Sequence, residues 1–127
     1  DELFDITYHN KVEKSGIEQM KFLARKYISE NDTENIYKYF CMLISAGESE
    51  IPLEYAINLF NLKHHKQALY YFSLISKTNN PIAKFYIAVM KFRGFGCEKN
   101  VDESYKILKY LSDNGIDRAT EFLNEYF

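Results

Sequence analysis

The sequence predicts an all-α protein built from antiparallel helix pairs, with about six to seven helices in total. The 127 residues contain only five Gly and two Pro, whereas an all-β chain needs a turn signal every ~8 to 12 residues. Apolar residues recur at helical spacing, and capping residues separate one such segment from the next. A hydrophobic content of 46% with 27% charged residues excludes a disordered chain and permits a real core.

The first quarter of the chain contains a polar stretch and then the first predicted helix pair. Residues 1–14 are predicted to be a polar N-terminal segment, either a frayed helix or the tail of a preceding unit. Ser15, with a Glu three residues later, has the form of a capping box, and this pattern predicts that the first helix begins there. The polar cluster around Asp32 ends that helix and caps the next one. Gly47 ends the pair, so residues 15–47 form a degenerate first repeat.

Two prolines mark the starts of the third and fifth helices. Pro52 suits the first turn of a helix, where its missing N–H is not needed. A short corner at residues 61–64 separates the third helix from a fourth one, and residues 52–80 form the second pair. Pro81 starts the fifth helix. Residues 82–92 contain only two polar side chains, which predicts a helix covered on both sides.

The third helix pair spans residues 81–116. Gly94 and Gly96 form its corner, because glycine accepts backbone conformations that other residues avoid. Asn100, again with a Glu three residues later, predicts the cap of the sixth helix, and Gly115 predicts its end. The pair is therefore complete, with a signal at each boundary.

The pattern of small and large residues then starts again in a terminal helix over residues 117–127. Ala119 follows Ala83 by 36 residues. Leu123 follows Ile87 by the same number. A fixed period of ~34 to 36 residues with two helices per period indicates a helical repeat array.

In residues 83–119, small and large residues follow one another at the positions typical of a known repeat. The matching positions are Ala83, Ile87, Ala88, Gly94, Gly96, Cys97, Asn100, Ser104, Leu108, Gly115 and Ala119. In spacing this segment resembles the Sel-one-like repeat, a relative of the tetratricopeptide repeat. It departs from the family's pattern at Ala88 (Gly in the family), Cys97 (Val), Asn100 (Asp) and Leu111–Ser112 (an Ala pair). Residues 52–80 look more like a plain tetratricopeptide repeat. The resemblance implies a short right-handed α-solenoid.

The resemblance also implies where a partner would bind. In such arrays the first helix of each pair lines the concave face. The residues that this places there are Leu53, Ile57, Phe60, Asn61, Lys84, Phe85, Val89, Lys91, Phe92 and Arg93. Apolar and aromatic anchors beside basic side chains suit a peptide that carries hydrophobic and acidic residues. The alternative is that several of these residues belong to the core.

We therefore expect a non-enzymatic protein–protein interaction module that serves as an adaptor, scaffold or regulatory subunit of a larger assembly. The distribution of charge along the chain supports an alternative function. Residues 51–100 contain seven Lys or Arg against two acidic residues, although the whole chain has a net charge of −2. With its many aromatic residues, this segment would suit an RNA- or ribosome-associated factor. Charges that segregate by chance on solvated helix faces would explain the same pattern.

Motifs for catalysis, cofactors or metals are missing from the sequence. Gly94-x-Gly96 lacks the third glycine of a dinucleotide fingerprint and follows a predicted helix, so no cofactor is expected. The adjacent His64 and His65 point in different directions on a helix and cannot form a metal-binding pair. The two cysteines, Cys41 and Cys97, are expected to be reduced packing thiols.

The longest uninterrupted apolar run, residues 85–90, is far shorter than the ~20 residues that cross a bilayer, so no membrane insertion is expected. The chain begins without Met or a hydrophobic leader. The expected location is the cytoplasm, or the lumen of the endoplasmic reticulum if a signal peptide was removed.

Overall fold

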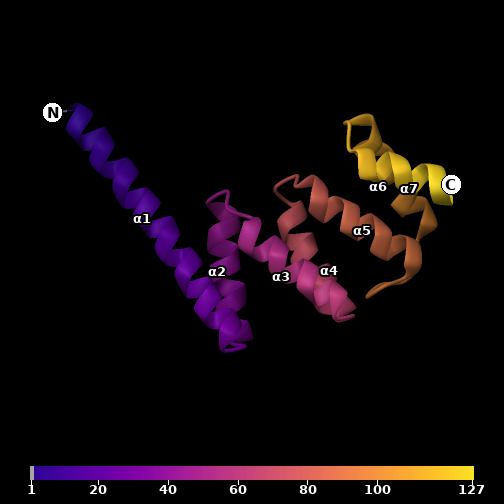
Figure 1. Ribbon diagram of the computed structural model, residues 1–127, viewed down its shortest axis with the longest axis horizontal. Helices are drawn as coiled ribbons and strands as arrows, with labels where there is room; N and C mark the ends of the chain where they lie inside the picture. Colours follow the sequence, from indigo (N-terminus) through magenta and orange to yellow (C-terminus); the bar gives the residue numbers. More distant parts are fainter. Residues whose placement is uncertain (1) are drawn as a thin grey trace. The chain divides into compact units, whose positions relative to one another are not determined.

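The computed structural model describes the backbone of residues 2–127 and the side chains of residues 16–127. The described backbone contains seven helices and no strand (Figure 1). They are α1 Glu2–Ser29, α2 Thr33–Ser45, α3 Glu50–Asn61, α4 His65–Ser76, α5 Pro81–Arg93, α6 Val101–Asp113 and α7 Asp117–Tyr126. Helices that follow one another pack together, α1 on α2 and then α4, α5, α6 and α7 in turn, which confirms the all-α fold of paired helices. The chain divides into two compact units, Asp1–Ile51 and Pro52–Phe127.

The first unit is a hairpin of α1 and α2 (Figure 1). Because α1 is already helical at Glu2, the predicted helix start at Ser15 is wrong. Residues 1–14 contain no Gly or Pro that would stop a helix, and Gly16 costs only about 1 kcal/mol inside one. The predicted capping contact of the Ser15 side chain lies outside the described side chains.

The turn between α1 and α2 is capped as predicted. The backbone N–H of Asn35 donates to Oδ1 of Asp32 at 3.3 Å, and its side-chain amide donates to Oδ2 at 2.7 Å. The buried face of α2 consists of Ile36, Phe40 and Leu43, which are spaced by one helical turn. Gly47 follows the helix with a φ of 82°, the left-handed conformation that ends many helices.

In the second unit, α5 lies between α4 and α6, both of which pack against it. The side chain of Asn80 accepts hydrogen bonds from the N–H groups of Ile82 (3.0 Å) and Ala83 (3.1 Å), so the start of α5 is capped. Gly94 ends the helix in the left-handed conformation. The buried residues of α5 are Ala83, Phe85, Ile87, Ala88 and Met90. The prediction of a helix covered on both sides is confirmed.

Small residues set the packing of α5 on α6. Ala88 and Ser104 are fully buried, and the Ser104 hydroxyl donates to the carbonyl oxygen of Ala88 at 2.7 Å. Asn100 caps α6 by accepting from the N–H of Glu103 at 3.0 Å. Its own N–H donates to the carbonyl oxygen of Lys91 at 2.8 Å. The Glu103 carboxylate therefore bonds the Asn100 side-chain amide at 3.2 Å, a variant of the predicted capping box.

Replacement of Ala88 by Leu is expected to lower the free energy of unfolding by about 1 to 3 kcal/mol, because the added carbons overpack the α5–α6 contact. Urea denaturation of the variant measures this loss. The control is Glu121→Leu, which adds an apolar side chain at an exposed position of α7. An unchanged midpoint for Ala88→Leu would contradict the close contact.

Aromatic rings join the remaining helices of this unit. Phe60 of α3 lies 5.2 Å from Tyr86 of α5, measured between ring centroids. The corner after α5 folds back onto the start of α4, where Phe95 stacks on His65 at 4.4 Å with an interplanar angle of 6°. At the other end of the unit, Phe122 of α7 belongs to the core cluster formed with α5 and α6.

Candidate partner-binding groove

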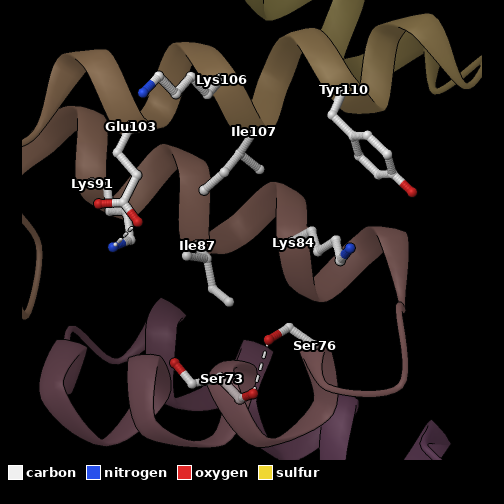
Figure 2. A pocket seen from close by; sticks show the side chains of 9 residues that line it. All are labelled: Ser73, Ser76, Lys84, Ile87, Lys91, Glu103, Lys106, Ile107 and Tyr110. Carbon is white, nitrogen blue, oxygen red and sulfur yellow. Dashed lines mark hydrogen bonds and ion pairs between the residues drawn. The ribbon is translucent and has the colours of Figure 1, made fainter.

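Three consecutive helices, α4, α5 and α6, form a groove with a volume of about 510 Å³ (Figure 2). We call this feature the groove. Its lining residues are Ser73 and Ser76 of α4, Lys84, Ile87 and Lys91 of α5, and Glu103, Lys106, Ile107 and Tyr110 of α6. All of them belong to the second unit.

Helical spacing explains why these side chains meet. The three residues from α5 are three and four positions apart, so they lie on one face of that helix. The four residues from α6 also share one face, while its neighbouring face carries the core residues Ser104, Leu108 and Leu111. Ile107 of α6 is partly buried and points toward α5, whereas Ile87 of α5 is only 8% exposed and points toward α4 (Figure 2). Both line the groove and contribute apolar surface to it.

The charges of the groove are mostly positive and unevenly paired. Nζ of Lys91 lies 2.9 Å from Oε1 of Glu103, so these two charges compensate each other at one end (Figure 2). At the other end, Nζ of Lys84 lies 4.9 Å from the ring centroid of Tyr110, a cation–π contact. Lys106 has no ion pair among the described side chains. Three lysines thus stand against one carboxylate.

The ten residues predicted to bind a partner do not form one surface. Lys84 and Lys91 line the groove. Phe85 and Phe92 instead make T-shaped contacts with one phenylalanine ring of α7, at 6.1 Å and 5.3 Å between centroids. Phe85 is only 8% exposed, and Val89 packs against the same core cluster. Phe85 therefore belongs to the core, which was the alternative to a role in partner binding.

The other predicted residues lie away from the groove. Nη2 of Arg93 donates to the hydroxyl of Tyr126 at 3.2 Å, and its guanidinium lies over the same ring at 5.4 Å. Phe60 is held in the aromatic contacts between α3 and α5. The remaining three residues are on α3: Leu53 and Ile57, which are partly buried, and Asn61, which is exposed.

Sequence reasoning missed the residues that α4 and α6 contribute. The prediction assigned partner binding to the first helix of each pair, whereas six of the nine lining residues belong to second helices. A signal was present in α6. Glu103, Lys106, Ile107 and Tyr110 recur at helical spacing beside the core series, so they form a second, mixed face of that helix.

Metal and membrane features are missing from the part of the chain that the structure describes. No group of three or more His, Cys, Asp or Glu side chains among residues 16–127 is arranged to hold a metal ion. Cys41 and Cys97 are free and partly buried. None of the described helices is both long and apolar enough to cross a membrane.

Comparisons with protein-family models, curated proteins and solved structures found no match for this chain. The class of protein is therefore defined by the fold alone. Over the described residues it is an all-helical, α-solenoid-like protein in which successive helices of each unit pack together.

Proposed function

We propose that this protein is a protein–protein interaction module and that the groove holds a segment of a partner protein. One observation carries the proposal: an apolar surface lies between three lysines and one glutamate, on a chain whose net charge is −2. A partner segment with hydrophobic and acidic residues would be complementary to it in both shape and charge.

The spacing of the groove residues indicates where the partner segment would carry its hydrophobic and acidic side chains. Lys84 and Lys91 are seven residues apart on α5, which corresponds to about 10 Å along the helix. Ile87 lies between them. A hydrophobic side chain on the more exposed Ile107, with an acidic one directed to Lys84 or Lys106, would use both kinds of contact. Since Lys91 is already paired with Glu103, it attracts an acidic residue less strongly.

A module of this kind acts as an adaptor, scaffold or regulatory subunit rather than as an enzyme. The resemblance of residues 83–119 to Sel-one-like repeats supports this role, because such repeats serve in adaptors and regulatory subunits. The proposed basic site retains Lys84 and Lys91 from the sequence prediction and adds Lys106. It replaces the aromatic residues Phe85 and Phe92, which contact α7.

The test is a fluorescence-anisotropy titration with synthetic peptides of about eight residues, long enough to cross the groove. In these short peptides, Leu or Ile is flanked by Glu. Replacing Lys84 and Lys106 together by Glu is expected to weaken binding about tenfold or more, because two attractive contacts become repulsive. Lys109→Glu is the matched control, since Lys109 is also on α6 but pairs with Asp113 at 3.2 Å and does not line the groove.

Two results would contradict the proposal. Equal binding of short peptides in which Lys replaces Glu would show that charge is not recognised, and no binding by any peptide of the panel would remove the site. A single-stranded RNA oligonucleotide is titrated alongside. If the RNA binds with strong salt dependence while the peptides do not, the nucleic-acid alternative takes the place of this function.

A further inference from the structure

Two smaller hollows lie beyond the groove, past Lys84 and Tyr110, and we call them the second and the third hollow. The second hollow has a volume of about 190 Å³ and shares both of these residues with the groove. The third hollow has a volume of about 70 Å³ and shares Pro81 and Ile116 with the second. The groove and the two hollows thus adjoin one another at shared lining residues, and together we call them the track.

The second hollow lies between the connection that leads into α5 and the one that leads into α7. Its lining residues are Asn79, Pro81, Lys84, Tyr110, Leu111, Asn114 and Ile116. A chain leaving the groove would pass between these two connections to reach α7. Both hollows are smaller than a helix of ~10 to 12 Å diameter requires, so they suit an extended chain.

Two amides in the second hollow have free hydrogen-bonding capacity of opposite kinds. The Asn114 side-chain amide donates to the carbonyl oxygen of Tyr110 at 2.8 Å, and its own Oδ1 accepts no bond among the described residues. Oδ1 of Asn79 accepts from Nζ of Lys84, which leaves the Asn79 NH₂ group as a donor. A peptide backbone offers one donor and one acceptor per residue, which matches this pair.

The two hollows, like the groove, are lined by more positive than negative side chains. Neither small hollow is lined by an acidic residue, and Arg118 of α7 lines the third. The Arg118 guanidinium lies 4.8 Å from the ring centroid of Phe85, a contact that holds the cation at the edge of the hollow. Along the whole track, four cationic side chains stand against Glu103 alone.

We propose that the partner segment leaves the groove past Lys84 and Tyr110 in an extended conformation and directs an acidic side chain to Arg118. This inference rests on the proposed function and specifies the partner. The segment is an acidic peptide whose hydrophobic residue fills the groove, whose backbone bonds the amides of Asn79 and Asn114, and whose second acidic site lies several residues away.

The test extends a short peptide by a flexible tail of about three to six residues, each adding ~3.3 Å of reach. The tail ends in Glu or, for comparison, in Gln, and it is attached at either end of the peptide. A Glu-ended tail at one end only is expected to tighten binding about two- to fivefold relative to the Gln-ended tail. Arg118→Gln is expected to remove this gain and to leave the affinity of the untailed peptide unchanged.

Lys77→Gln is the matched control, because Lys77 is exposed after α4 and lines no part of the track. It should preserve the gain. A Glu-dependent gain that survives in Arg118→Gln, or no gain with any tail at either end, would overturn the extension while leaving groove binding in place. Failure of the untailed peptides to bind would overturn the proposed function and the extension together.

Discussion

Replacement of Gly96 by Ala is expected to destabilise the second unit by about 2 to 5 kcal/mol. Two effects add at this position. The backbone has a φ of +72°, a conformation that side chains with a Cβ rarely adopt. In addition, a Cβ atom would lie 2.6 Å from the carbonyl oxygen and 2.7 Å from the carbonyl carbon of His65, which are backbone atoms that cannot move aside independently.

Gly115→Ala separates these two effects. Gly115 also has a positive φ, +84°, but a Cβ there meets no atom within 4 Å. Its replacement should therefore cost only the backbone term, about 1 to 2 kcal/mol. Urea denaturation of both variants measures the difference. Equal losses at the two glycines would show that the corner after α5 does not press against the start of α4.

Replacement of Phe72 by Ala is expected to lower the free energy of unfolding by about 3 to 5 kcal/mol. Phe72 of α4 is fully buried, and its ring stacks on Tyr86 of α5 with 4.7 Å between centroids and an interplanar angle of 9°. Truncation removes both the buried apolar area and the stacking, and it leaves a cavity between the two helices. Chemical denaturation with a fluorescence or circular-dichroism signal measures the loss.

Leu62→Ala provides the comparison for Phe72→Ala, since Leu62 is 67% exposed at the corner between α3 and α4. Its truncation should change the free energy of unfolding by no more than about 0.5 kcal/mol. A loss at Leu62 as large as the loss at Phe72 would mean that the corner, rather than the α4–α5 contact, limits the stability of this unit.

The helix boundaries could be predicted wherever a local signal decides them. Asn80 and Asn100 cap their helices through their own side chains, and Gly94 ends α5 through its own backbone conformation. These contacts span only a few residues, so the sequence contains all of the information. The start of α1 could not be found in this way. A capping pattern at Ser15 marks a possible helix start, but nothing upstream prevents the helix from beginning at Glu2.

The candidate site was predictable only in part, because it depends on which helix covers each face of α5. Lys84 and Lys91 were recognised as basic residues beside apolar ones, and both line the groove. The same helix also carries Phe85 and Phe92, which the sequence shows as equally suitable anchors. Their contact with α7 removes them from the groove. Such a choice between faces requires contacts with other helices, which no local pattern encodes.

The ion pair between Lys91 and Glu103 gives the groove a direction. One end contains the paired Lys91 and Glu103, with the Lys106 side chain extending toward Glu103, and Lys84 at the other end keeps its positive charge (Figure 2). A chain lying in a symmetric groove could run either way. Here the Glu103 carboxylate stands at one end only and repels an acidic residue there, so a segment with an acidic residue at only one end would direct that residue toward Lys84. Two partners with the same residues in reversed order would therefore be distinguished.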